Sequence, residues 1–143
     1  NQHRDERDSA TRRTFYVLFL DGYLAEEGQR QPTVLGASIG DTGVIAMFKP
    51  VIDALATARF VEQTTLVHEF GHAAGLVDNG LTMTRPHQDA DHGAHCDNSD
   101  CVMHYLNEGA KDLVGFVRRV VKTDSTVLFD GPCLDDARAA ATP

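Results

Sequence analysis

The sequence predicts an α+β domain in which a small sheet precedes a long helix, and three observations support this. Apolar and β-branched runs of strand length occupy residues 14–20, 33–40 and 43–48. Residues 58–75 carry apolar side chains at helical spacing, and residues 131–141 are typical of a terminal helix. The chain has 143 residues, which suits one hydrophobic core, so we expect a single domain over residues 1–143.

The predicted strands lie in the N-terminal half, after a polar segment, residues 1–13, that we expect to be flexible. Residues 14–20 (TFYVLFL) predict a buried strand that ends at an Asp-Gly turn, and residues 23–32 predict a loop or a short helical turn. Residues 33–40 and 43–48 flank the turn sequence DTG, which favours an antiparallel hairpin. Pro50 ends the second strand of that hairpin.

Two or three helices are expected in the rest of the chain. The helix over 58–75 ends at Gly75, a common helix stop. Residues 76–100 have no sustained periodicity, and a loop of that length in a small domain is often functional. A further helix over 112–122 is weakened by a glycine, whereas the one over 131–141 has Pro132 in its first turn and acidic residues near its positive end.

Composition and charge exclude several classes of partner. The net charge of −8 is spread along the chain, which argues against nucleic acids and anionic membranes as main partners. No apolar run approaches the roughly 18 residues that a membrane span needs, so we expect no membrane span. We expect a monomer.

The stretch HEFGH (68–72) carries the strongest chemical signal in the sequence. On a helix, His68 and His72 lie one turn apart on one face and can direct both imidazoles at one metal ion. Glu69 projects close to that ion yet is poorly placed to bind it, which is where a general base for an activated water belongs. The apolar helix around the motif indicates burial, and buried histidines need partners.

The stretches HEFGHAAG (68–75) and VMHY (102–105) together resemble the metzincin zinc peptidases. The resemblance implies a compact metzincin-like domain, with a small twisted mixed sheet packed on the active-site helix, a Met-turn and a C-terminal helix. It implies that Gly75 turns the chain toward a third ligand, that Met103 forms an apolar floor under the zinc ligands, and that Tyr105 stabilises an oxyanion.

Two residues compete to be the third ligand. Asp78 follows Gly75 at the metzincin spacing, where an aspartate resembles the snapalysin variant, although VDNG is also turn chemistry. His95 precedes Cys96 in HCDNSDCVM (95–103), which resembles the archaemetzincins, and imidazole is the commoner third ligand. We therefore place His95 ahead of Asp78. His87 and His92, in the preceding loop, are weaker candidates.

The three cysteines also allow two interpretations. Cys96 and Cys101 are close enough in sequence for a disulfide that would fix the turn leading into Met103. The archaemetzincin resemblance, extended to FDGPCL (129–134), instead implies a second, structural zinc bound by Cys96, Cys101 and Cys133 with Asp130. The disulfide is placed ahead, and because it needs an oxidising compartment, a secreted or periplasmic protein is favoured over a cytoplasmic one.

The expected function is that of a zinc-dependent endopeptidase acting on a peptide or protein substrate. One zinc held by His68, His72 and His95 or Asp78 would activate water, with Glu69 as general base and Tyr105 at the oxyanion. The resemblance implies that the substrate adds as a strand to the edge formed by residues 33–40 or 43–48. The alternative is a non-catalytic zinc-binding interaction module that keeps the metzincin shape, and another zinc hydrolase such as an amidase would use the same residues.

Overall fold

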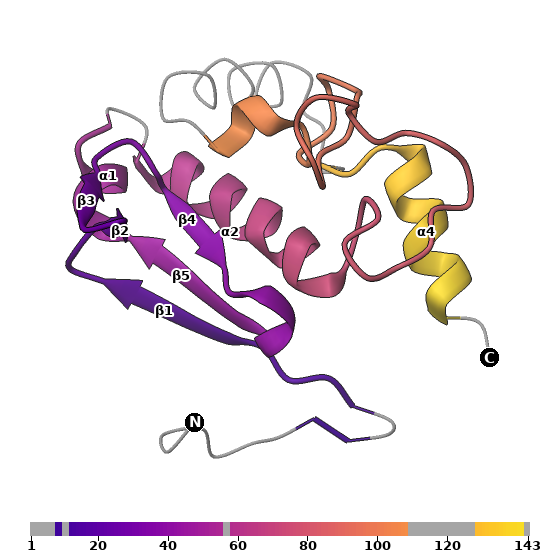
Figure 1. Ribbon diagram of the computed structural model, residues 1–143, viewed down its shortest axis with the longest axis horizontal. Helices are drawn as coiled ribbons and strands as arrows, with labels where there is room; N and C mark the ends of the chain where they lie inside the picture. The colour runs from indigo at the N-terminus through magenta and orange to yellow at the C-terminus, as the bar shows by residue number, and fades with distance from the viewer. Residues whose placement is uncertain (1–7, 10–11, 56–57, 109–127, 142–143) are drawn as a thin grey trace.

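The predicted strands assemble into a three-stranded sheet in the order β1-β5-β4 (Figure 1). The computed structural model describes residues 8–9, 12–55, 58–108 and 128–141. Strand β1 (Tyr16–Leu20) pairs in parallel with β5 (Val44–Phe48), and β4 (Gly36–Ser38) pairs antiparallel with β5. The predicted hairpin is therefore confirmed, with the short 3-10 helix η1 (Gly40–Thr42) at its turn.

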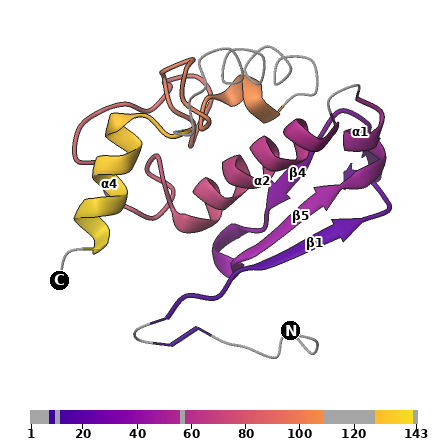
Figure 2. The same cartoon turned by 180° about the vertical axis from the view of Figure 1, so that it is seen from behind.

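The prediction that residues 14–20 form a buried strand is wrong in one respect, because the strand exists but is exposed. Its apolar side chains from Val17 to Leu20 are each more than a third exposed, and Phe19 reaches 53%. The physical reason is position: β1 is an edge strand, and the described helices cover one face of the sheet (Figures 1 and 2).

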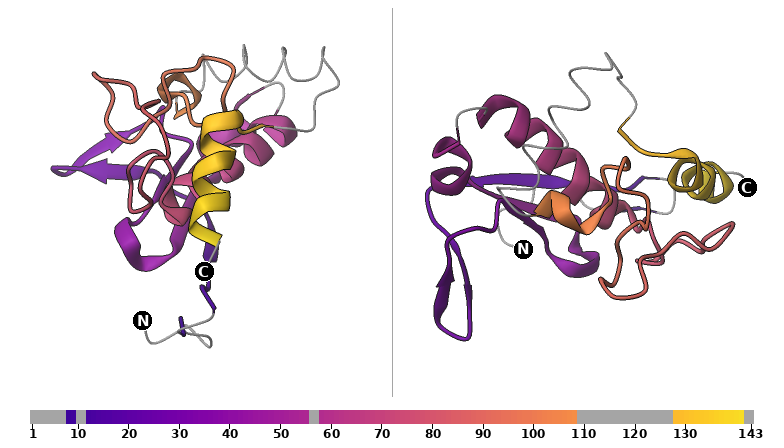
Figure 3. Two further views of the ribbon diagram at one scale, coloured as in Figure 1. Left: turned by 90° about the vertical axis from the view of Figure 1, so that its right-hand side faces the viewer. Right: turned by 90° about the horizontal axis from the view of Figure 1, so that it is seen from above.

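The prediction of a loop or helical turn over residues 23–32 is also wrong. Strands β2 (Leu24–Glu26) and β3 (Gln29–Gln31) form a second, two-stranded antiparallel sheet. Glu27 and Gly28 both have positive φ, at 49° and 77°, which is the backbone of a type I′ hairpin turn. This hairpin projects away from the main sheet (Figure 3).

The long helix α2 (Ala58–Ala74) crosses the sheet and ends at Gly75, so the helix predicted over 58–75 is confirmed. Gly75 has φ 93°, a left-handed conformation that suits glycine at a helix end. Helix α1 (Lys49–Asp53) begins directly after β5, with Pro50 in its first turn, and confirms that the proline ends the strand. Helix α4 (Gly131–Ala141) confirms the predicted terminal helix. The helix expected over 112–122 lies outside the described residues.

The core lies between the sheet and α2 and continues under the chain that leads to α4. Fully buried side chains from β5, α1 and α2 share the core with buried residues from the end of the long loop, from residues 101–103 and from α4. These are Ile45, Met47, Ile52, Val61, Cys96, Cys101, Val102, Met103 and Cys133. The fold is thus a mixed α+β domain with a small mixed sheet, as the sequence predicted.

Residues 76–100 follow an irregular path after α2, as expected. They run beside α4, to which Thr84 and His87 are both hydrogen-bonded through Asp136 (Figure 1). Asp136 is almost fully buried and accepts these bonds, a role that its position near the positive end of the helix did not by itself predict. Within the described part of the chain, no helix is long and apolar enough to cross a membrane.

Candidate metal centres and cleft

Three histidines meet at the end of α2 that lies near Gly75. His68, His72 and His95 each offer a ring nitrogen, and these atoms lie within 4.8 Å of one another. The Nε2 atoms of His68 and His72 are 3.0 Å apart. The ring centroid of His95 is 5.4 Å from that of His68 and 4.9 Å from that of His72. Three imidazoles from two separate segments therefore face one point.

Backbone carbonyls hold two of the three rings in orientation. His68 Nδ1 lies 2.6 Å from the Val102 carbonyl oxygen, and His95 Nδ1 lies 2.5 Å from the His92 carbonyl oxygen. In each ring the Nδ1 proton donates to the carbonyl, which leaves Nε2 deprotonated and available to a metal. His68 is fully buried and His95 nearly so, which limits movement of both rings.

The structure brings His95, and not Asp78, beside the two helix histidines. Asp78 is exposed, has φ 58°, and belongs to the tight turn that follows Gly75. Asn79 in the same turn donates from Nδ2 to the His72 carbonyl oxygen at 2.9 Å, and Leu81 N donates to Gly75 O at 2.9 Å. The turn thus closes on the helix end, and its aspartate stays outside the group of three histidines.

Met103 packs directly beneath the histidine-bearing part of α2. It is fully buried, and its sulfur lies so near Gly71 that a Cβ on that glycine would sit 2.3 Å from it. The Met103 carbonyl oxygen accepts the Cys96 N–H at 2.8 Å, which ties this turn to the residue after His95. The glycine inside HEFGH is therefore a site of close approach, and the sequence analysis did not single it out.

Tyr105 begins the 3-10 helix η2 (Tyr105–Glu108) and packs on the long loop. Its ring stacks on His92 with centroids 3.5 Å apart and planes 1° apart, and it also contacts His104. Tyr105 is not among the residues that line the cleft described next. Its part in oxyanion binding stays a prediction.

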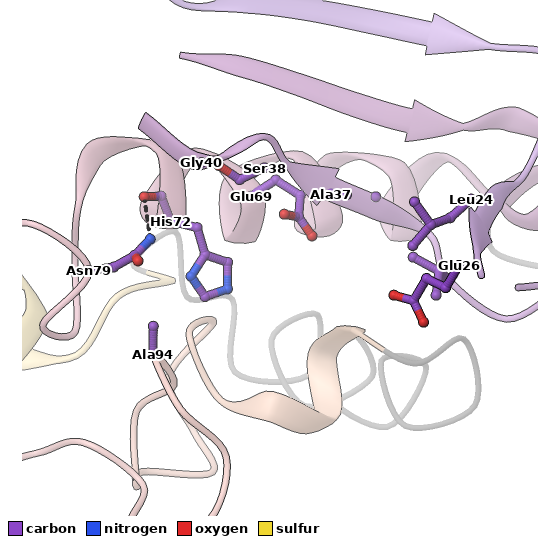
Figure 4. A pocket seen from close by; sticks show the side chains of 11 residues that line it. Leu24, Glu26, Ala37, Ser38, Gly40, Glu69, His72, Asn79 and Ala94 are labelled. Atoms are coloured by element: carbon purple, nitrogen blue, oxygen red, sulfur yellow. Dashed lines mark hydrogen bonds between the residues drawn. The ribbon is translucent and has the colours of Figure 1, made fainter. Parts of the chain in front are cut away.

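A cleft of about 380 Å³ opens beside the three histidines, between β4 and the long loop (Figure 4). Glu69 and His72 line it from α2, Ala94 lines it from the loop, and Glu26 stands at its far end. Strand β4 forms one wall, and a Cβ on Gly36 would lie 2.9 Å from Glu69 Cγ. The glycine therefore lets β4 approach the helix at the level of Glu69.

A second group of metal-binding side chains lies under the first, at the start of α4. His87, Cys96, Asp130 and Cys133 each offer a ligand atom within 4.8 Å of the others. Cys96 Sγ is 3.6 Å from His87 Nδ1 and 3.4 Å from Asp130 Oδ2. Cys101 adjoins the group, with its sulfur 3.6 Å from that of Cys133.

The disulfide between Cys96 and Cys101 is not formed, and this prediction is wrong. All three cysteines are free thiols, and all are buried. The Cys101 sulfur lies 3.6 Å from that of Cys133, and the Cys96 sulfur lies 3.6 Å from His87 Nδ1 and 3.4 Å from Asp130 Oδ2, so the three thiols belong to one hydrogen-bonded group. The cysteines therefore give no reason to favour an oxidising compartment.

Hydrogen bonding among the thiols sets their protonation in the metal-free chain. Contacts from Cys133 and then Cys96 lower the pKa of Cys101 to about 4. The same contact with Cys101 raises the pKa of Cys96 to about 11, and contacts with Cys101 and Cys96 also raise that of Cys133. The opposite directions of these shifts mean that loss of a proton from one sulfur is stabilised by the other two, which favours binding of a cation.

His87 is the member of this group that the sequence interpretation placed elsewhere. Its Nε2 lies 2.7 Å from Asp136 Oδ2, and its Nδ1 faces Cys96 and Cys133 at 3.6 and 3.9 Å. Burial opposes protonation of His87, but the hydrogen bonds with Asp136 and Cys96 outweigh it and raise its pKa. A ring held by a carboxylate on one side and facing thiols on the other resembles a metal ligand with its outer partner.

Comparison with known proteins identifies no family for the chain. No protein-family model matches the chain, and neither the curated proteins nor the solved structures contain a significant match.

Proposed function

We propose that the protein is a zinc-dependent endopeptidase with a metzincin-like active site. The observation that carries the proposal is the convergence of His68, His72 and His95 beside a cleft that His72 and Glu69 line. The Met103 turn beneath the helix and the exposed edge of β4 above it fit the arrangement that the metzincin resemblance implies.

The donor set suits zinc. Tetrahedral zinc with imidazole nitrogens at about 2.0–2.1 Å separates neighbouring nitrogens by about 3.3–3.4 Å. The 3.0 Å between the Nε2 atoms of His68 and His72 is close to that value, so a small outward movement of the rings would admit the ion. Three neutral imidazoles leave a fourth position for a solvent molecule on the cleft side, as catalytic zinc sites do.

Bound zinc would act as a Lewis acid toward the scissile carbonyl and lower the pKa of an attacking water. The protein's own part begins with Glu69, which lines the cleft next to the histidines and takes the proton from that water. The same carboxylic acid then delivers the proton to the leaving amine. Carbonyl oxygens of His92 and Val102 keep His95 and His68 aimed at one point throughout.

Replacement of Glu69 tests this function. Glu69→Ala should keep bound zinc, because the ligands are untouched, and should lose most hydrolysis of a peptide library, since general-base catalysis contributes about 10²–10⁴-fold. Glu62→Gln is the matched control: Glu62 lies on the same helix and pairs with Lys49, 2.5 Å away, instead of lining the cleft. Zinc content and cleavage rate are measured on the same preparations.

Four results separate the alternatives. Hydrolysis that a chelator abolishes, and that Glu69→Ala removes with zinc retained, supports the endopeptidase. Full activity in Glu69→Ala contradicts the mechanism. Tightly held zinc without cleavage of any peptide would instead support the non-catalytic zinc-binding module. Cleavage of non-peptide amides alone would indicate another zinc hydrolase.

We also propose that the second group holds a structural zinc. With zinc–sulfur distances of about 2.3 Å, tetrahedral ligand atoms lie about 3.8 Å apart. The separations of 3.6 Å between Cys101 and Cys133, 3.6 Å between Cys96 and His87, and 3.9 Å between Cys133 and His87 are close to this. His87 thus competes with Asp130, the residue implied by the archaemetzincin resemblance, for the fourth position.

Zinc content per chain tests the second centre. We expect about two zinc ions per chain in the wild type and about one in Cys133→Ser. If His87 is a ligand, His87→Ala also lowers the content to about one, whereas Asp130→Ala leaves it near two. A wild-type content near one that Cys133→Ser does not change would contradict the structural zinc.

A further inference from the structure

The cleft is lined by acidic side chains, and one of them has no part in the proposed hydrolysis. The described residues that line it include two carboxylates, Glu26 and Glu69, and no lysine or arginine. Glu69 is nearly buried against the metal centre, whereas Glu26 is exposed and its carboxylate stands at the far end of the cleft from His72 (Figure 4).

Glu26 is held in place by the β2–β3 hairpin rather than by a charged partner. It pairs in register with Gln29 across the tight turn, and it has no ion-pair or hydrogen-bonding side chain among the described residues. The nearest basic residue in the hairpin, Arg30, is directed elsewhere, with its guanidinium 3.3 Å from the centre of the Tyr23 ring. The carboxylate is therefore available to a cation that enters the cleft.

The backbone of β4 indicates how a peptide would lie beside this carboxylate. Leu35 O accepts from Phe48 N and Ile39 N donates to Val44 O, so alternate residues of this strand face β5. By the antiparallel alternation, the N–H and C=O groups of Gly36 and Ser38 face the other way, toward the open edge. Both residues line the cleft, so an extended peptide can pair with them.

The direction of β4 then indicates which end of a bound peptide lies near Glu26. In Figure 4, Ala37 lies nearer to Leu24 and Glu26 than Ser38 and Gly40 do, so β4 runs away from the hairpin. A peptide that pairs antiparallel with β4 runs the opposite way, and antiparallel pairs outnumber parallel ones two- to threefold. Its residues C-terminal to the scissile bond therefore reach the hairpin.

We propose that Glu26 is a specificity-determining residue that selects substrates with a lysine or arginine on the C-terminal side of the scissile bond. This inference rests on the proposed peptidase function. The net charge of −8 supports it, because a negative field raises the encounter rate of cationic peptides. Each such contact is solvent-exposed, so its effect on kcat/KM is about two- to fivefold.

The test uses the full zinc-loaded chain and quenched fluorescent peptides of one parent sequence. Single positions on either side of the cleaved bond carry lysine, glutamine or glutamate, and the cleaved bond is located by mass spectrometry. The wild type should cleave the peptide with lysine on the C-terminal side about two- to fivefold faster than the glutamine peptide at low salt, and high salt should reduce the difference.

Three variants complete the experiment. Glu26→Gln should remove the lysine preference without lowering cleavage of the glutamine peptide, and Glu26→Arg should transfer the preference to the glutamate peptide. Glu27→Gln, a change of the same kind at the next residue, outside the cleft lining, should leave the preference unchanged.

Each remaining outcome overturns a stated part of the argument. A preference that persists in Glu26→Gln, or equal rates for all three peptides, overturns the assignment of Glu26 while the peptidase function stands. A preference for lysine on the N-terminal side overturns the antiparallel placement. Failure of the zinc-loaded wild type to cleave any peptide overturns the proposed function itself.

Discussion

The close approach of Met103 to α2 predicts an unusual response to the replacement Gly71→Ala. In most helices this change stabilises, by about 1 kcal/mol, because alanine is the better helix former. Here the new Cβ would sit 2.3 Å from Met103 Sδ and 3.2 Å from a ring carbon of Phe129. Ordinary heavy-atom contacts are about 3.5–4.0 Å, so the methionine must move by more than about 1 Å.

The gain in helix propensity and the cost of overpacking oppose each other, and their relative sizes decide whether Gly71→Ala stabilises or destabilises the protein. Met103 is fully buried, and overpacking of a buried site costs about 1–3 kcal/mol. The net result is a destabilisation of up to about 2 kcal/mol once the helix gain of about 1 kcal/mol is subtracted. Displacement of Met103 would also disturb Val102, whose carbonyl orients His68, so zinc affinity should fall as well.

Urea unfolding of a double-mutant cycle, followed by far-ultraviolet circular dichroism, measures the effect. Met103→Ala alone should cost about 2–5 kcal/mol through the cavity that it leaves. In that background Gly71→Ala no longer meets the sulfur, so it should become stabilising by about 1 kcal/mol. Gly22→Ala is the control, since a Cβ there meets nothing within 4 Å. If Gly71→Ala stabilises the wild type, the reasoning is refuted.

Three further predictions concern the strand, the third ligand and acid stability. Gly36→Ala should keep zinc but reduce hydrolysis by at least tenfold, because its Cβ would lie 2.9 Å from both Glu69 and Thr65 and would push β4 from the helix; unchanged kcat/KM would contradict the role of the close approach. His95→Ala should lower the zinc content by one ion, whereas Asp78→Ala should not; the reverse result would assign the third position to Asp78. Burial opposes ionisation of Asp136, but hydrogen bonds from Thr84 and His87 outweigh it and lower its pKa. The stability that this carboxylate contributes is therefore present above its ordinary pKa near 3.9 and is lost as pH falls through the lower folded value. Denaturant titrations of the metal-free protein at several pH values should show that the free energy of unfolding falls at acid pH, and that it falls less steeply in Asp136→Asn. The same pH dependence in both proteins would refute this role of Asp136.

Local sequence signals predicted the helix that bears His68 and His72. They failed for structural features that depend on contacts between residues far apart in the sequence. Helix α2 could be predicted because its apolar spacing and Gly75 are local signals, and the β4–β5 hairpin followed from its turn residues. The β2–β3 hairpin was missed because its turn, Glu27-Gly28, lacks the Asn-Gly or Asp-Gly signal typical of type I′ turns. The exposure of β1 depends on what covers the sheet, which no local pattern encodes.

The centre itself shows the same division. His68, Glu69 and His72 are set by one helical turn, so a motif suffices to group them. The pairing of His87 with Asp136 joins residues 49 positions apart, and the place of Gly71 under Met103 depends on a turn from another segment. His95 could be favoured over Asp78 only through a family resemblance and the general preference of zinc for imidazole, because the spacing after Gly75 supports the aspartate.

The long loop connects the two candidate centres. His87 faces the thiols of the second group, while His92 orients His95 through its carbonyl and carries the Tyr105 ring. Backbone bonds from Asp97 N to His87 O, at 2.9 Å, and from Asp89 N to His95 O, at 2.7 Å, join these parts into one unit. Because His95 and Cys96 are adjacent, we expect a change at the second centre to be felt at the first.

This coupling has a measurable consequence for the first centre. Loss of an outer partner of a metal ligand commonly lowers metal affinity by 10- to 100-fold. His87→Ala should therefore weaken the zinc held by the three histidines by about that factor, although the substituted residue touches none of them. Competition with a chromogenic chelator would measure it. An unchanged zinc affinity would mean that the Met103 turn and the helix position His95 without the loop, and that the loop does not couple the two centres.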